Sequence, residues 1–140
     1  MANTQGVSGA AKQAALSAIV DGKTLKAALY LASATTGPTN AVYTATGEVS
    51  GSGYSAGGVS VTNGNTAGLT STTSYWTPSA TIAFGTVTLA TAFDAVMIYS
   101  TDDSDRNIGV FTFGSQTVTA APFSITMPTN DSSTGLVRLA

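Results

Sequence analysis

The sequence contains no cysteine and no histidine among its 140 residues. Without cysteine the chain cannot form a disulfide, a thiolate nucleophile or a cysteine-ligated zinc site. Without histidine it lacks the commonest general base near neutral pH, so neither a Ser-His-Asp nor a Cys-His catalytic system can be built. A glycosidase needs only two carboxylates, but no spacing of the acidic residues suggests a matched pair. The sequence therefore predicts a protein that is not an enzyme and needs no cofactor.

Charge is also scarce, since charged residues make up 9% of the chain and the formal net charge is -2, against a usual charged share of about 25%. The cations are only Lys12, Lys23, Lys26, Arg106 and Arg138. Nucleic acids and anionic membranes are bound by clusters of cations, so neither is an expected partner. No run of about 18 apolar residues could span a membrane, and the stretch from Ala14 to Val20 does not read as a signal peptide. A surface with so little charge suits a protein that is packed against other proteins.

Threonine, serine, asparagine and glycine supply the polarity that charge does not, and this mixture is typical of strands joined by turns. Residues 1–9 read as a flexible N-terminal arm, and residues 10–140 as a single domain. Ser8 is placed to cap a helix from about Ala10 to Val20, which Asp21-Gly22 ends. About eight short strands follow, so the fold class expected is an all-β, jelly-roll-like β-sandwich with one short N-terminal helix.

Three local patterns refine this expectation. Alternation from Leu25 to Leu31 predicts a half-buried strand, and Asn63-Gly64 predicts a tight hairpin turn. Alternation changes phase at Gly85, which predicts a β-bulge. Residues Ile108 to Phe113 are apolar on both faces, which predicts a central strand.

The most suggestive site pattern is the acidic turn from Asp103 to Gly109. Its oxygen ligands alternate as in calcium loops, but Ile108 stands where an EF-hand needs glycine and Gly114 stands where it needs glutamate. A solvated hairpin turn explains the same residues, because Asp and Asn favour turns. Whether the Asp102–Asp105 turn binds calcium stays open, and no metal site is assigned.

Three aromatic residues are candidate interface anchors. Tyr54 stands in the glycine-rich stretch from Gly47 to Gly58, and it could either contact a partner or fold back over the end of the sheets. Tyr75 and Trp76 pose the same choice, with burial favoured for Trp76 because its side chain is so largely apolar.

The segment from residue 28 to 59 carries a resemblance. Ala28-Leu29-Tyr30 precedes Glu48-Val49-Ser50-Gly51-Ser52-Gly53-Tyr54 and then Gly57-Gly58-Val59. This order of an "ALY" strand and an "EVSGxGY" loop resembles small virion proteins of tailed bacteriophages, and above all the capsid cement, or decoration, proteins with a jelly-roll fold. The overall plan is similar over most of the chain.

The resemblance implies a structural protein that is made in the host cytoplasm and binds the outside of an icosahedral capsid, where it stabilises the shell by bridging subunits of the major capsid protein. It also implies self-association, as a homodimer or a trimer. Candidate contact residues lie in the arm and the glycine-rich loop, together with the aromatic pair: Asn3, Thr4, Gln5, Glu48, Val49, Ser50, Tyr54, Tyr75 and Trp76. An alternative is a receptor-binding or carbohydrate-binding module at the tip of a fibre.

Overall fold

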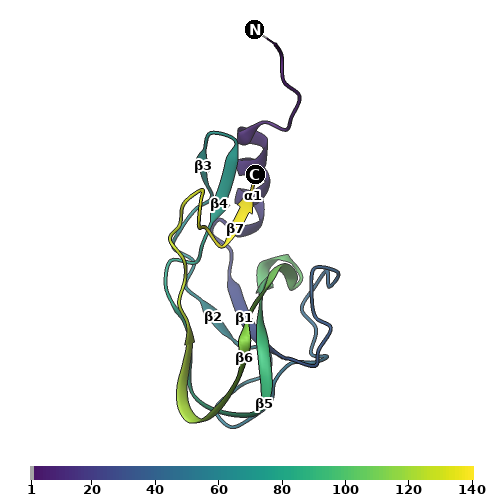
Figure 1. Ribbon diagram of the computed structural model, residues 1–140, viewed down its shortest axis with the longest axis vertical. Helices are drawn as coiled ribbons and strands as arrows, with labels where there is room; N and C mark the ends of the chain where they lie inside the picture. The colour runs from purple at the N-terminus through teal and green to yellow at the C-terminus, as the bar shows by residue number, and fades with distance from the viewer. Residues whose placement is uncertain (1) are drawn as a thin grey trace.

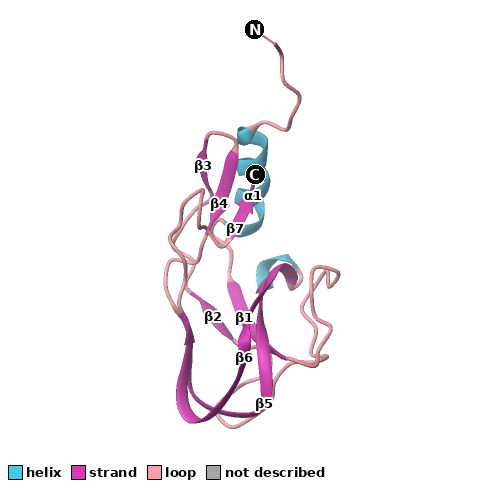
Figure 2. Ribbon diagram, viewed as in Figure 1, coloured by secondary structure: helices cyan, strands magenta, loops and turns pink. Residues whose placement is uncertain are grey.

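The computed structural model describes residues 2–140 and consists mainly of β-strands (Figures 1 and 2). Its elements are α1 (Gly9–Val20), β1 (Leu25–Leu31), β2 (Val59–Val61), β3 (Gly68–Thr70), β4 (Thr73–Trp76), β5 (Ile82–Ser100), the 3₁₀ turn η1 (Thr101–Asp103), β6 (Arg106–Ile125) and β7 (Val137–Leu139). The strands form two antiparallel sheets, in the orders β2-β1-β5-β6 and β3-β4-β7. The predicted all-β class with one short N-terminal helix is confirmed, whereas the jelly-roll topology is not. Met1, the first residue of the predicted arm, lies outside the described residues.

Helix α1 begins and ends where capping chemistry places it. The Ser8 hydroxyl accepts a hydrogen bond from the Ala11 N–H at 3.2 Å, and the Asp21 N–H donates to the Ser17 carbonyl at 3.0 Å. Leu16 and Val20 are fully buried, and the helix packs mainly on β4 of the smaller sheet. The predicted helix was one residue too short at its start.

Strand β1 lies inside the larger sheet, between β2 and β5. Leu25, Ala27 and Leu29 point into the main core, while Ala28 and Tyr30 belong to a second cluster on the opposite face. The prediction of a half-buried strand was wrong, because the chain between β1 and β2 covers this second face: Tyr43 stacks on Tyr99 with ring centroids 4.8 Å apart.

Strands β5 and β6 form one long hairpin of 19 and 20 residues where the sequence suggested several separate strands. The hairpin curls at the end of the molecule far from α1 and the C-terminus, which lie side by side toward the other end (Figure 1). The register shifts between Ala83 and Gly85, where Gly85 has a φ of +73°, so the predicted bulge is confirmed.

The segment Ile108–Phe113 is not central, because β6 is an edge strand of its sheet. Its apolar residues divide between two clusters, since Phe111 packs against the main core and Val110 against the second one. Ile108 is an extra residue at the register shift beside Tyr99, because Ile98 pairs with Gly109 and Tyr99 pairs with Asn107. This extra residue interrupts the alternation of inward and outward side chains along the strand. Apolar residues on both faces therefore did not indicate a central position.

Candidate interaction surfaces

The stretch that carries the resemblance closes one side of the body. The Val49 N–H donates to the Leu29 carbonyl at 3.0 Å, and the Leu31 N–H donates to the Gly47 carbonyl at 2.9 Å. Residues 47–49 thus pair with the end of β1 beyond the place where β2 stops. The chain then reaches the first half of β5, where the Thr88 N–H donates to the Ser52 carbonyl at 2.9 Å.

Close backbone approaches explain the glycines of this stretch. A Cβ on Gly53 would lie 2.2 Å from the Thr86 carbonyl oxygen, and a Cβ on Gly58 would lie 1.7 Å from that of Ala27. Both residues also have positive φ angles, of +81° and +77°. The glycine-rich loop is therefore packed against the strands that it connects, whereas its composition suggested an accessible surface for contacting a partner protein.

Glu48 is the centre of a hydrogen-bond network in the same region. Its carboxylate accepts from the Tyr43 hydroxyl at 2.5 Å, from the Tyr54 hydroxyl at 2.7 Å and from the Gly57 N–H at 2.8 Å. The Tyr54 hydroxyl accepts in turn from the Leu29 N–H at 3.0 Å, and its ring stacks on Phe84. Of the two alternatives for Tyr54, the structure has the side chain folded back.

The tyrosines around Glu48 hold their protons strongly. Burial, followed by the negative charge of Glu48, raises the pKa of Tyr30 to about 12. Burial and the charge of Asp105 raise the pKa of Tyr99 to about 12. Burial and the hydrogen bond to Glu48 raise the pKa values of Tyr43 and Tyr54 still further. These hydroxyls remain hydrogen-bond donors at neutral pH, so the network holds segments together.

Two of the candidate contact residues are buried in the chain's own core. Val49 is 4% exposed and Trp76 is 0% exposed. The Trp76 indole N–H donates to the Asn63 side-chain oxygen at 3.2 Å, and the Asn63 amide donates to the carbonyls of Val20 and Lys23. Assigning Val49 and Trp76 to an interface was therefore wrong, because each fills the interior that its apolar side chain favours.

Asn63-Gly64 does not form the predicted hairpin turn either. The segment after β2 leaves its sheet and leads to β3 in the other one. The Asn63 side chain bonds to the end of α1 and to Trp76, so a tertiary role replaces the local turn.

Five other candidates are at least partly accessible. Tyr75 lies half-buried in β4, opposite Arg138 of β7, and packs closely on Gly68. Ser50 is exposed. Asn3, Thr4 and Gln5 are also exposed, in a segment that extends away from the body beyond α1 (Figure 1). The structure does not bring Tyr54, Tyr75 and Trp76 to one common surface, since their side chains pack against different parts of the chain.

Val7 is a candidate that the sequence reading missed. It lies in the same extended segment as Asn3, Thr4 and Gln5, and its side chain is 64% exposed, more than the other exposed large hydrophobic residues Val42 and Leu139. The sequence signal that could have identified it is a single large apolar residue among the polar and small residues of the arm.

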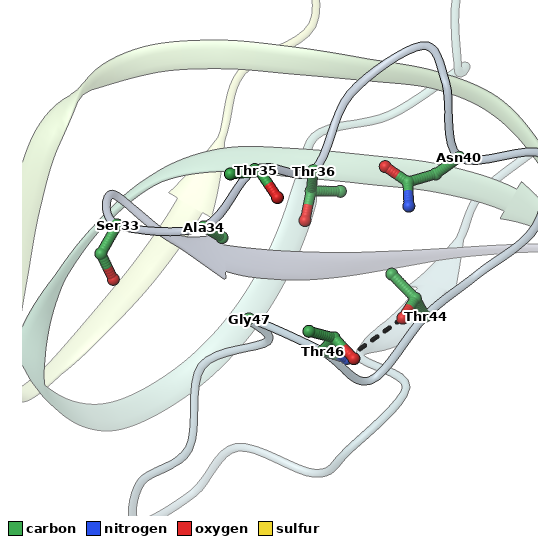
Figure 3. A pocket seen from close by; sticks show the side chains of 8 residues that line it. All are labelled: Ser33, Ala34, Thr35, Thr36, Asn40, Thr44, Thr46 and Gly47. Carbon is green, nitrogen blue, oxygen red and sulfur yellow. Dashed lines mark hydrogen bonds between the residues drawn. The ribbon is translucent and has the colours of Figure 1, made fainter.

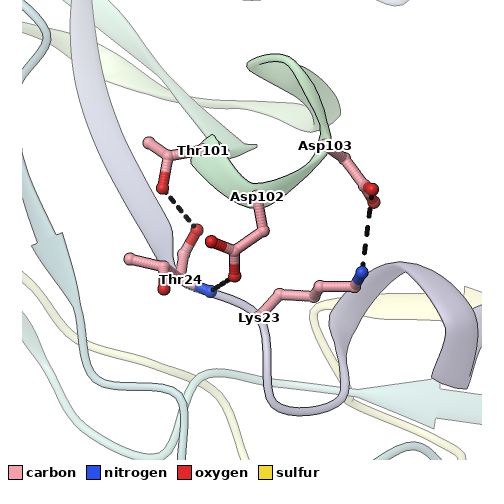
Figure 4. Close-up of polar contacts among 5 residues, drawn as sticks. All are labelled: Lys23, Thr24, Thr101, Asp102 and Asp103. Atoms are coloured by element: carbon pink, nitrogen blue, oxygen red, sulfur yellow. Dashed lines mark hydrogen bonds and ion pairs between the residues drawn. The ribbon is translucent and has the colours of Figure 1, made fainter.

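The acidic turn holds the start of β1 in place (Figure 4). The Thr24 N–H donates to the Asp102 carboxylate at 2.6 Å, and the Thr101 hydroxyl donates to the Thr24 carbonyl at 3.2 Å. Lys23 forms an ion pair with Asp103 at 3.6 Å. Two of the carboxylates that were considered for calcium thus have partners within the chain. Across residues 2–140, acidic side chains do not gather in threes as a metal site would need.

A polar hollow of about 470 Å³ lies beside the chain that follows β1 (Figure 3). Its lining carries hydroxyl groups and one amide but no charged or aromatic side chain: Ser33, Ala34, Thr35, Thr36, Asn40, Thr44, Thr46 and Gly47. The Asn40 side-chain oxygen already accepts from the Gly37 N–H, and the Thr44 hydroxyl accepts from the Thr46 N–H. The hollow contributes an uncharged, hydroxyl-rich surface.

Comparisons with protein-family models, with curated proteins and with solved structures find no match to this chain. No helix within residues 2–140 has the length and hydropathy that crossing a membrane requires.

Proposed function

We propose that this chain is a non-enzymatic structural protein of a phage virion, which binds the outside of an icosahedral capsid and bridges neighbouring subunits of the major capsid protein. The observation that carries the proposal is the extended segment Ala2–Ser8, whose side chains are all exposed and which projects beyond α1 (Figure 1). An exposed valine in such a segment has apolar surface available for a partner. The resemblance of residues 28–59 to cement proteins supports a capsid as that partner.

The surface chemistry supports the same proposal. The accessible candidates and the hollow beside β1 present hydroxyl and amide groups, and the whole chain has only 9% charged residues. Such a surface can lie against other proteins without the cost of removing water from many charges. Contacts of this kind are modest one by one, but repetition over a shell and attachment to two subunits at once raise the total affinity.

The mechanism of stabilisation is linkage. A protein that binds only the assembled shell stabilises it by about 2.7 kcal/mol per site when its free concentration is a hundred times Kd. No chemical step is needed, which agrees with a chain that has neither histidine nor cysteine.

Co-sedimentation with shells that lack this protein tests the proposal. The full chain should pellet with the shells and saturate a fixed number of sites. Val7→Ser should weaken binding several-fold, since it removes the apolar surface of the arm. Val42→Ser is the matched control, because Val42 is also exposed, at 49%, but lies in another segment. Failure of the unaltered chain to pellet would refute capsid binding, and equal losses for the two variants would refute the role of the arm.

A further inference from the structure

Asn63-Gly64 is the one Asn-Gly pair in the sequence, and the structure does not use it as a hairpin turn. Such a pair is chemically reactive, because the backbone nitrogen of the glycine can attack the side-chain amide carbon of the asparagine. Glycine favours this attack, since it has no Cβ to block the approach and its backbone turns freely. The reaction needs a mobile amide and a mobile backbone, and both are restrained in this chain.

The side-chain amide of Asn63 is held at both of its polar atoms. Its Nδ2 donates to the carbonyls of Val20 and Lys23, at 2.6 Å and 2.9 Å, and its Oδ1 accepts from the Trp76 indole at 3.2 Å. Ring closure would draw the amide carbon onto the Gly64 nitrogen and pull the amide away from these partners. The native contacts of the amide therefore oppose the attack.

The backbone around Asn63 is held by Ser79. The Gly64 N–H donates to the Ser79 hydroxyl oxygen at 2.8 Å. The Ser79 hydroxyl and the Ser79 N–H both donate to the Thr62 carbonyl, at 3.1 Å and 3.0 Å. One residue is thus bonded to the peptide groups on both sides of Asn63, and these bonds restrict the backbone rotation that ring closure requires.

We infer that Asn63 is a deamidation site that the native contacts keep closed, and that it reacts in molecules whose segment 62–64 has come away from α1 and Ser79. In the reaction the Gly64 nitrogen bonds to Cγ of Asn63, the bond from Cγ to Nδ2 breaks, and Nδ2 leaves as ammonia with the proton that Gly64 loses. One water molecule then opens the succinimide ring at either carbonyl, which leaves aspartate or isoaspartate at position 63. Water is the only co-reactant.

The product would not restore the native contacts. An ionised carboxylate has no N–H to donate, so it would face the carbonyls of Val20 and Lys23 with partial charges of the same sign. Isoaspartate would also lengthen the backbone by one carbon. Half-buried acceptors without donors are costly, so a molecule that has reacted would not close again as before. The reaction therefore marks, permanently, each molecule in which this joint between α1 and the smaller sheet has opened. This assignment does not depend on capsid binding.

Deamidation of the full chain in mildly alkaline buffer, with and without enough guanidinium chloride to unfold it, tests the site. Mass spectrometry of proteolytic peptides measures the replacement of NH₂ by OH at each asparagine. Asn63 should react at least about tenfold more slowly in the folded chain than in denaturant, because only the opened fraction reacts. Asn65 is the internal control, since Thr66 follows it and a β-branched side chain hinders the attack. An Asn63 that is no faster than Asn65 in denaturant would overturn the inference, and so would equal rates for Asn63 in the two conditions.

Ser79→Ala tests the restraint on the backbone. It removes the oxygen that accepts from the Gly64 N–H, so deamidation of Asn63 in the folded chain should become several-fold faster, with an unchanged far-UV spectrum and an unchanged rate in denaturant. Ser60→Ala is the matched control, because Ser60 is also exposed and lies in β2, just before this segment. Equal rates for the two variants would contradict the part given to Ser79.

Asn63→Asp tests the consequence of the reaction, since it supplies one of the two products directly. Its midpoint of guanidinium unfolding, followed by tryptophan fluorescence, should fall further than that of Asn65→Asp, whose amide makes one hydrogen bond, to the Thr77 carbonyl. An Asn63→Asp chain as resistant to denaturant as the unaltered protein would show that the joint closes again after reaction, and would overturn the claim that deamidation is a permanent record of opening.

Discussion

At the scale of single residues, Asn63 joins three segments that lie apart in the sequence. Its amide donates to the Val20 carbonyl at 2.6 Å and to the Lys23 carbonyl at 2.9 Å, where α1 has ended. Its oxygen accepts from the indole of Trp76, which is fully buried. Removing this side chain would leave a buried N–H without a partner, which is costly in an apolar interior.

Asn63→Ala should therefore lower the free energy of unfolding by about 2–3 kcal/mol, from the unpaired indole and the lost bonds to the helix end. Urea unfolding monitored by the fluorescence of the single tryptophan measures it. Asn65→Ala is the control, because its amide makes one bond, to the Thr77 carbonyl at 2.9 Å. The free energy of unfolding of this control should fall by about 1 kcal/mol. An equal fall for the two variants would contradict the role given to Asn63.

The buried tyrosines predict a loss of stability at alkaline pH. Tyr30 and Tyr99 have folded-state pKa values of about 12, above the usual value of about 10 in an unfolded chain. As pH rises, these tyrosines lose their protons in the unfolded state before they do so in the folded state. Their contribution to the free energy of unfolding is therefore complete below about pH 10 and is lost as pH rises toward 12.

Between about pH 10 and 12 the free energy of unfolding should fall by up to about 1.4 kcal/mol per pH unit for each of these tyrosines. Urea titrations at a series of pH values measure the slope, and the tyrosinate absorbance of the buried tyrosines should appear together with unfolding. Tyr99→Phe should reduce the slope. A flat profile over this range would refute the raised pKa values.

At the scale of elements, the closed side of the body depends on close contact between backbones. Residues 47–49 pair with β1, and Ser52 pairs with Thr88 of β5. The approach of Gly58 to Ala27 leaves no space for a side chain. A substitution there must move a strand of the core.

Gly58→Ala should lower the free energy of unfolding by at least about 2 kcal/mol, because the added Cβ adds a backbone clash to an unfavourable positive φ. Gly114→Ala is the control, since its Cβ would meet no atom within 4 Å, and it should change stability by less than about 1 kcal/mol. Thermal melts of the two variants give the comparison, and a Gly58→Ala protein as stable as the control would contradict this packing.

Local sequence patterns predicted the elements whose causes are local. Ser8 and Asp21 mark the helix ends, and the phase change at Gly85 marks a bulge, because each depends on neighbouring residues. The position of Ile108–Phe113 at a sheet edge and the burial of Val49 depend on strands far along the chain. The hydrogen bond from Tyr54 to Glu48 could not be predicted from the sequence either, since a glycine-rich loop can be either open or packed against the body.

At the scale of the whole molecule, the body carries little charge and presents an extended, exposed N-terminal arm. Binding through such surfaces should depend little on ionic strength, because few charges are screened. The apparent Kd for shells should change by less than about threefold between about 50 mM and about 500 mM salt. A much steeper dependence would assign the binding to the few charged residues in place of the uncharged surface.

The proposed stabilisation of a capsid is tested most directly by the temperature at which DNA-filled capsids that lack this protein release their DNA, followed with a DNA-binding dye. Adding the purified chain in excess should raise the release temperature and bring it to a plateau when all sites are filled. A release temperature that stays the same at every concentration of the chain would contradict a stabilising role on the shell.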